Sequence, residues 1–324
     1  MADTLLKGRD IISFAEWEGE EILKALELAE EMREKRFYPG FANILSQRSF
    51  LMFFFSISAQ RRFSFEVSAA ELGGAAFCCD MKDEGFRTPG ENFIRQAGIL
   101  SRYACGAGVR VLEENLSGWG EGEDILRRFS GTSDIPVFSL GHDTGDPCRG
   151  LSEVMLYRRM LGEDLEGKSI LHLWVPGSAP GARGALYESI RLSLHLGMKV
   201  RVSHPEGYSP SPEIIDAARK KSGGEITLEE GFPEESQEAD VVYLCPWMSG
   251  ESFGSGKLDI EKEREKAASL KKWGSPLDKM KLKDKAVVID NLSGRVFSGD
   301  SPAGDTVKEM LHAQKALMAL TLSG

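Results

Sequence analysis

The feature that most constrains the fold is an alternation of short apolar runs with longer amphipathic stretches. The run 50–55 is almost entirely apolar, which is typical of a buried strand, and the stretch after Ser58 places Phe65 and Leu72 on one face of a helix. The same alternation starts again at residues 169–174. Strands that alternate with helices usually pair in parallel and are covered on both faces. The pattern therefore predicts an α/β protein with two doubly wound parallel-sheet domains.

The chain divides into two halves at a polar turn over residues 162–168. At 324 residues it is long enough for two domains of ordinary size, each with its own core. We expect the first domain over residues 1–150 and the second over residues 151–304. A final amphipathic stretch predicts a closing helix over residues 305–322.

The composition argues against several classes of partner. The net charge of −10 disfavours nucleic acid and anionic membranes, although a local arginine cluster could still bind a small anion. No apolar run approaches the length of a membrane span, and the N-terminus carries no apolar signal region, so a cytoplasmic location is expected. The five cysteines lack metal-ligand spacing, and no glycine-rich nucleotide loop is present. We therefore expect neither a metal nor a cofactor.

The segment between the first apolar run and its helix has the outline of an anion site. It reads Ser58-Ala59-Gln60-Arg61-Arg62. A strand that ends here would deliver a serine and two arginines to the N-terminus of a helix. Free backbone N–H groups, the helix dipole and guanidinium groups all favour a negative charge at such a place. The segment therefore predicts a small anionic ligand that carries a phosphate or a carboxylate.

Residues 58–66 resemble the signature Ser-Thr-Arg-Thr-Arg-x-Ser-Phe-Glu, which binds carbamoyl phosphate in the aspartate/ornithine carbamoyltransferase superfamily. The second half is most similar to the acetylornithine and unknown-substrate transcarbamylases, through Trp174, residues 197–200, 204–208, 222–224 and 239–243, and Trp247. The resemblance implies a carbamoyl-phosphate domain, an amino-acid domain and a final helix packed back on the first domain. It also implies a homotrimer with the Ser58 segment near a subunit boundary, and it allows a knot in the second domain.

The resemblance implies a substrate-binding role for four residues of this first motif. Ser58 matches the signature, and Arg62 matches its second arginine. Gln60 stands in place of the central arginine, and Arg61 stands in place of a threonine. Two interpretations of Arg61 stay open. It restores the missing positive charge, or it points to solvent, since a shift of one residue turns a helical side chain by about 100°.

The resemblance implies a catalytic role for three further residues. Arg110 follows a predicted strand, at the carboxyl edge where α/β sheets bind ligands. The third motif of the family, His-Pro-x-Gln, corresponds to residues 146–149, so Asp146 replaces the histidine and Arg149 replaces the glutamine. A carboxylate near a developing oxyanion would repel it, whereas Arg149 adds a cation. A plain Asp146–Arg149 ion pair is the alternative.

The acceptor side of the site is expected after the last strand of the second domain. The fourth motif of the family, His-Cys-Leu-Pro, corresponds to residues 290–293, where the leucine alone is kept. The resemblance implies that Asp290, Asn291 and Leu292, together with Trp247, bind the acceptor. In the glycine- and proline-rich loop that follows Trp174, Arg183 is a further candidate for an anion contact at the domain interface.

These motifs predict transfer of a carbamoyl group from carbamoyl phosphate to an amino-acid-like acceptor, through an altered site and without ordinary ornithine or aspartate activity. One alternative is a catalytically degenerate paralogue that keeps the fold and binds another anion or partners an active subunit. Another is a different small-molecule enzyme that uses Asp146, Arg149 and Asp290 across the cleft.

Overall fold

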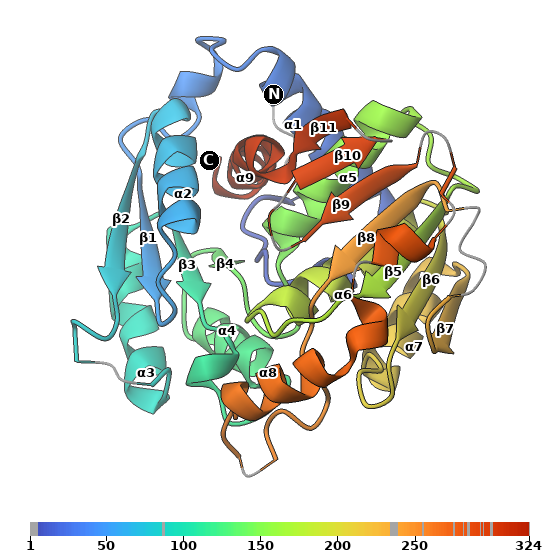
Figure 1. Cartoon of the computed structure of the whole chain (residues 1–324). Helices are drawn as coiled ribbons and strands as arrows, with labels where there is room; N and C mark the ends of the chain where they lie inside the picture. The colour runs from blue at the N-terminus through green and yellow to red at the C-terminus, as the bar shows by residue number, and fades with distance from the viewer. Residues whose placement is uncertain are drawn as a thin grey trace.

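The computed structural model describes residues 6–85, 88–233, 239–254, 256–274, 276–280, 282–283, 286–291, 293, 295–298 and 301–323. It contains two β-sheets, one from each half of the chain, that lie side by side with helices packed around them (Figure 1). Parallel strands make up the first sheet and most of the second, so the prediction of two parallel-sheet α/β domains is confirmed.

The first sheet has the strand order β2-β1-β3-β4, and every pair in it is parallel. Its strands are β1 (Ser49–Phe54), β2 (Ala75–Asp80), β3 (Gly106–Arg110) and β4 (Val137–Ser139), and its helices are α2 (Ala59–Glu71), α3 (Glu91–Leu100) and α4 (Glu121–Gly131). Phe50 stacks on Phe65 of α2, whereas Phe53 contacts Phe93 of α3 and Phe129 of α4. Strand β1 is apolar from Phe50 to Phe54, as is typical of a strand that is covered on both faces.

The second sheet has the strand order β11-β10-β9-β8-β5-β6-β7. Its strands are β5 (Ser169–Trp174), β6 (Lys199–His204), β7 (Ile226–Glu230), β8 (Val241–Cys245), β9 (Val287–Asp290), β10 (Arg295–Ser298) and β11 (Ser301–Asp305). Strands β5 to β9 are parallel, and β10 and β11 form an antiparallel hairpin on the β9 edge. The sequence did not predict this hairpin. The helices of this half are α6 (Ala182–His195), α7 (Pro212–Ser222) and α8 (Ile260–Ser269).

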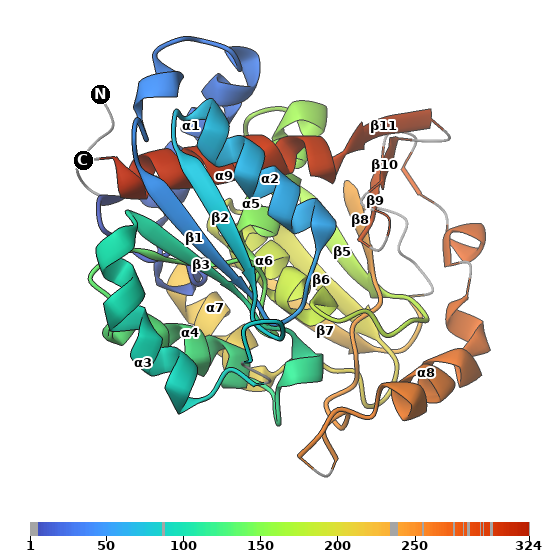
Figure 2. The same ribbon diagram turned by 90° about the vertical axis from the view of Figure 1, so that its left-hand side faces the viewer.

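Helix α9 (Thr306–Leu322) follows β11 of the second sheet and packs on helices of the first half of the chain. It packs against α1 (Gly19–Glu34), α2 and α5 (Pro147–Leu161), and it runs across the molecule behind α2 (Figure 2). Its Lys315 is fully buried, and the ammonium group lies 2.8 Å from Glu71 Oε2 of α2. This packing brings the first turn of α9 to the N-terminal ends of α2 and α5.

Helix α6 forms a close contact with the loop that follows β4. A Cβ atom on Gly184 would lie 2.3 Å from the carbonyl oxygen of His142, so glycine is required for this approach. Glu188 accepts a hydrogen bond from the backbone N–H of Phe14 at 3.1 Å, and Arg191 donates to the carbonyl of Thr144 at 3.0 Å. These contacts fix α6 of the second half on the first half.

Short 3₁₀ helices connect the larger elements. They are η2 (Phe14–Glu16), η3 (Phe41–Asn43), η4 (Ser101–Tyr103), η5 (Glu113–Asn115), η6 (Lys271–Trp273) and η7 (Pro276–Lys279). Among the residues described above, none of the helices has both the length and the apolar character needed to cross a bilayer.

Candidate functional site

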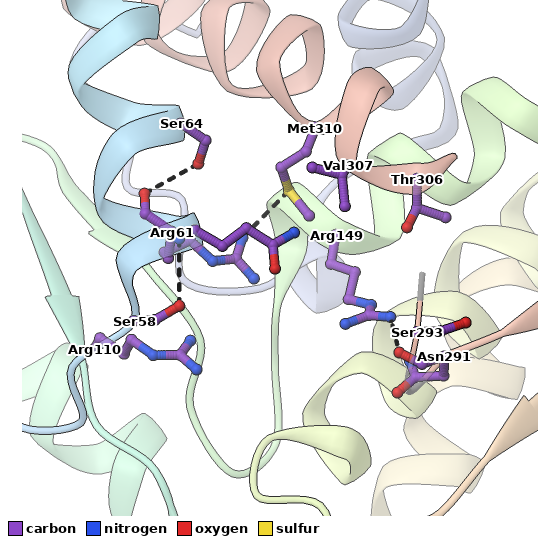
Figure 3. A pocket seen from close by; sticks show the side chains of 11 residues that line it. Ser58, Arg61, Ser64, Arg110, Arg149, Asn291, Ser293, Thr306, Val307 and Met310 are labelled. Carbon is purple, nitrogen blue, oxygen red and sulfur yellow. Dashed lines mark hydrogen bonds between the residues drawn. The ribbon is translucent and has the colours of Figure 1, made fainter. Parts of the chain in front are cut away.

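A pocket of about 120 Å³ lies where the two halves meet. It is lined by the N-terminus of α2, the end of β3, the first turn of α5, the segment after β9 and the first turn of α9 (Figure 3). The lining residues are Ser58, Gln60, Arg61, Ser64, Arg110, Arg149, Asn291, Ser293, Thr306, Val307 and Met310. Three guanidinium groups therefore surround one small cavity.

The local sequence explains how α2 meets this pocket. Ser58 is the N-cap of the helix, and its Oγ accepts a hydrogen bond from the backbone N–H of Arg61 at 3.3 Å. Arg110 is the last residue of β3, the strand next to β1 in the sheet. The carboxyl ends of parallel strands meet at one edge, so Ser58 and Arg110 come together there. The positive end of the α2 dipole adds to this arrangement.

Arg61 and Asp146 form a buried ion pair beside the pocket. Arg61 Nη2 lies 2.5 Å from Asp146 Oδ2, and Arg61 Nη1 lies 3.2 Å from Met310 Sδ of α9. Asp146 is also the N-cap of α5, where its Oδ1 accepts the backbone N–H of Arg149 at 3.3 Å. The interpretation that Arg61 points to solvent is therefore wrong. The predicted ion pair between Asp146 and the Arg149 side chain is also wrong, because Asp146 pairs with Arg61 instead.

Arg110 has no carboxylate within ion-pair distance among the described residues. Its Nη1 donates to the carbonyl of Leu140 at 2.7 Å, and its buried Nε has no hydrogen-bond partner within the same set. Burial, together with the nearby charge of Arg61, lowers the pKa of Arg110 to about 10. The side chain is still charged at neutral pH, so it presents to the pocket a positive charge that forms no ion pair within the described residues, although the carboxylates of Asp146, Glu113 and Glu114 lie near enough to oppose the fall in its pKa.

Arg149 is held by residues from both halves of the chain. Its Nε donates to Glu153 Oε1 at 3.0 Å, and its Nη2 donates to the carbonyl of Asn291. Tyr243 of β8 donates to the same carboxylate oxygen at 2.9 Å and accepts a hydrogen bond from the Asn291 amide. Burial raises the pKa of Glu153 to about 7, and Arg149 opposes this rise. The network fixes the direction of the Arg149 side chain at the pocket wall.

The structure brings most of the predicted site residues together, with exceptions. Ser58, Gln60, Arg61, Arg110, Arg149 and Asn291 line the pocket, and Asp146 contacts it through Arg61. Arg62 is exposed on α2 and pairs with Glu66 at 2.8 Å. Asp290 ends β9, does not line the pocket, and accepts a hydrogen bond from Ser293 at 2.6 Å. Leu292 lies outside the described residues.

Trp247 does not reach the pocket. It is fully buried in the second half, where its indole N–H donates to the carbonyl of Tyr208 at 2.7 Å. The placement of Trp247 in the acceptor site is therefore corrected, because the side chain belongs to the core around β5 and β8.

Sequence reasoning missed the contribution of α9 and of Ser64 and Ser293. Thr306, Val307 and Met310 form the α9 wall of the pocket. The expected return of the final helix to the first domain was the one signal that could have indicated them. The parts of the chain that the structure describes contain no group of three or more His, Cys, Asp or Glu residues able to hold a metal ion.

Comparison with known proteins shows the family to which the chain is similar. Residues 9–159 match the model of the aspartate/ornithine carbamoyltransferase carbamoyl-P binding domain, and residues 185–321 match that of the Asp/Orn binding domain. The chain is 29% identical to the ornithine carbamoyltransferase of Archaeoglobus fulgidus over 324 residues, with 96% of each chain covered. It is 30% identical to that of Staphylothermus marinus over 336 residues, with 98% of this chain and 99% of the relative covered.

Solved structures agree with the fold. The ornithine carbamoyltransferase of Pyrococcus furiosus superposes with a TM-score of 0.76 at 24% identity, over 98% of both chains. An acetylornithine transcarbamylase complexed with acetylcitrulline superposes with a TM-score of 0.80 at 22% identity, over 98% of this chain and 99% of the other.

Proposed function

Because the chain belongs to the aspartate/ornithine carbamoyltransferase family, we propose that its pocket binds carbamoyl phosphate and transfers the carbamoyl group to an amino-acid-like acceptor. We further propose that ornithine and aspartate are not its ordinary acceptors. A homotrimeric assembly and a cytoplasmic location belong to the same proposal.

The observation that carries the proposal is the charge of Arg110, which forms no ion pair within the described part of the chain. A partly exposed cation whose Nε is buried, and which has no ion-pair partner within the described residues, is costly, and a bound anion would offset that cost. The phosphate group of carbamoyl phosphate would meet Arg110, Ser58 and the free N–H groups at the start of α2. Arg61 and Arg149 already have carboxylate partners. A bound anion would therefore stabilise Arg110 more than the other two arginines of this pocket.

The proposed reaction needs no cofactor. The amine nitrogen of the acceptor attacks the carbamoyl carbon, the bond from that carbon to the phosphate oxygen breaks, and phosphate leaves with the electron pair. The proton released by the amine goes to the departing phosphate. Positive charge and N–H donors at the phosphate end favour this departure, because negative charge builds up there in the transition state.

The acceptor proposal rests on the side of the pocket formed by α5 and β9. The family motif carries a neutral glutamine at the position of Arg149, whereas this chain places a guanidinium there, fixed by Glu153 and by the carbonyl of Asn291. A cation at this wall disfavours a positively charged acceptor such as ornithine. The same cation favours an acceptor in which the groups that lie near Arg149, apart from the reacting amine, are neutral or negatively charged.

A second candidate function is anion binding without catalysis. The ion pair between Asp146 and Arg61 favours this second candidate. The family motif places a histidine at this position, whereas this chain has a carboxylate that is already paired. Losing one donor to a developing oxyanion typically slows such a reaction about 10²–10³-fold.

An acceptor screen tests the proposal. The protein is incubated with carbamoyl phosphate and a set of amines that includes ornithine, aspartate, acidic amino acids other than aspartate, and N-acylated amino acids, and phosphate release is followed. We expect release with at least one acceptor from the last two classes and little with ornithine or aspartate. Ordinary turnover with ornithine or aspartate would overturn the acceptor proposal. Tight binding of carbamoyl phosphate without turnover of any amine would favour the second candidate.

A further inference from the structure

A second, larger cavity lies at the junction of the two halves and shares no residue with the Arg110 pocket. Its volume is about 520 Å³, and it is lined by the start of α4, the loop after β4, α6, the start of α7 and Gly250. The lining residues are Trp119, Gly120, Thr144, Arg183, Tyr187, Ser209, Pro210, Ser211, Pro212, Glu213, Ile214 and Gly250. Cavities at domain interfaces are common places for small ligands.

Arg183 is the residue of this cavity that lacks a charge partner. Arg61, Arg183 and Arg191 are the buried arginines of the described residues. Arg61 pairs with Asp146 and Arg191 pairs with Glu188, but Arg183 has no carboxylate within 4.0 Å among the residues that the structure describes. Arg183 is only 4% exposed, and its Nε has no hydrogen-bond partner within that part of the chain.

The contacts that Arg183 does make only partly compensate its burial. Its Nη2 donates to the carbonyl of Ser209 at 2.9 Å, and the guanidinium carbon lies 4.5 Å from the centre of the Trp119 ring. One carbonyl and one aromatic face stabilise a guanidinium by a modest amount, whereas burying an unpaired charge costs several times more. A negative charge in the cavity would remove that imbalance.

From these contacts we infer that the cavity beside Arg183 is a second ligand site, which takes a small oxyanion carried on an apolar or aromatic body. Arg183 would bind the carboxylate or phosphate. The apolar body would lie against Trp119, Pro210 and Ile214, which form much of the wall. This inference does not depend on the proposed function, because the two cavities have no residue in common.

Two acidic groups near the cavity restrict the charge that a ligand of this site can carry. Glu213 lies at the rim, is exposed, and accepts a hydrogen bond from Ser211 Oγ at 2.6 Å. Asp143 accepts the backbone N–H of Gly120 at 2.5 Å. A ligand with a single compact negative charge at Arg183 fits this surrounding better than a highly charged polyanion, because both carboxylates would repel a second charge.

Trp119 provides a fluorescence signal that reports on this cavity. The chain has five tryptophans, and Trp17, Trp174, Trp247 and Trp273 are all buried, whereas Trp119 is partly exposed at the cavity. Intrinsic fluorescence is recorded during titration of the full chain with sodium benzoate and, separately, with sodium phosphate at constant ionic strength. We expect a saturable change with benzoate that is absent in Trp119→Phe. If phosphate gives the same change at equal concentration, the anion alone is recognised.

Three variants decide the inference. Arg183→Gln should weaken benzoate binding about tenfold or more, since a charged hydrogen bond is lost. Glu213→Gln removes a rim charge and should tighten binding about twofold. Ile214→Glu puts a charge on the apolar wall, leaves Arg183 in place and should weaken binding, so it serves if Arg183→Gln does not fold.

The Arg110→Gln variant separates the two cavities. It should leave the benzoate response of Trp119 unchanged, whatever it does to carbamoyl phosphate. The inference is overturned if benzoate and phosphate give no saturable response, or if Arg183→Gln and Ile214→Glu bind benzoate as well as the unmodified chain.

Discussion

The guanidinium of Arg61 and the carboxylate of Asp146 form a buried ion pair that joins the N-terminus of α2 to the N-terminus of α5. The resemblance to the family signatures sets Arg61 at the position of a threonine and Asp146 at that of a histidine. In the structure the charge of each residue is neutralised by the other. The pair therefore adds no net charge to the pocket.

The pairing of Arg61 with Asp146 predicts strong coupling between the two positions. Arg61→Thr or Asp146→His alone should lower the free energy of unfolding by about 3–5 kcal/mol, because either change leaves a buried charge unpaired. The double variant should lose clearly less than the sum of the two. Denaturant unfolding of all four proteins measures the cycle, with exposed Arg62→Gln as a control expected within about 0.5 kcal/mol. Additive losses would show that the pair is not coupled.

Two helical glycines provide a matched test of the contact between α6 and the loop after β4. Gly184→Ala would place a methyl group 2.3 Å from the carbonyl oxygen of His142, so we expect a loss of about 1–3 kcal/mol in unfolding free energy. Gly131→Ala, in the last turn of α4, meets no atom within 4 Å and should be neutral or stabilising by about 0.5–1 kcal/mol. Equal effects of the two substitutions would mean that this contact is looser than the structure indicates.

Glu113 predicts a pH dependence of stability at the same junction. Its buried carboxylate accepts the backbone N–H of Gly181 at 2.8 Å, and burial raises its pKa from 4.5 to about 7. The folded state therefore holds this proton more tightly than the unfolded state. The stability that Glu113 contributes is fully present below pH 4.5 and is lost as the pH rises through 7.

The Glu113→Gln variant isolates that contribution. It should match the unmodified protein near pH 4.5 and be more stable at pH 8, by an amount on the order of 3 kcal/mol. Unfolding free energies measured between pH 4.5 and pH 8 for both proteins give the difference. A difference that does not change with pH would contradict the assignment.

Local patterns in the sequence were sufficient to predict the strand ends and the helix N-terminus that surround the pocket. The apolar run 50–55 and the polar turn after it fixed the end of β1 and the start of α2, and Ser58 is the N-cap that such a turn favours. Arg110 ends β3 as expected, and parallel pairing places it beside that N-cap. These features depend on periodicity and capping, which a single sequence displays.

Contacts between distant residues could not be predicted in this way. Arg61 and Asp146 are 85 positions apart, and no local pattern selects Asp146 rather than solvent as the partner of Arg61. The β10–β11 hairpin was missed because β11 is short and contains Pro302 and Gly304, which are both depleted in strands. Trp247 was assigned to the site by a motif, whereas packing placed it in the core.

Calorimetric titration with carbamoyl phosphate tests the central claim most directly. The claim is that Arg110, which lacks an ion-pair partner among the described residues, makes the pocket an anion site for this donor. We predict saturable binding to the unmodified protein, affinity weakened by about tenfold to a hundredfold in Arg110→Gln, and unchanged affinity in Arg62→Gln. Absence of binding, or equal affinity in the Arg110→Gln variant and the unmodified protein, would contradict the account.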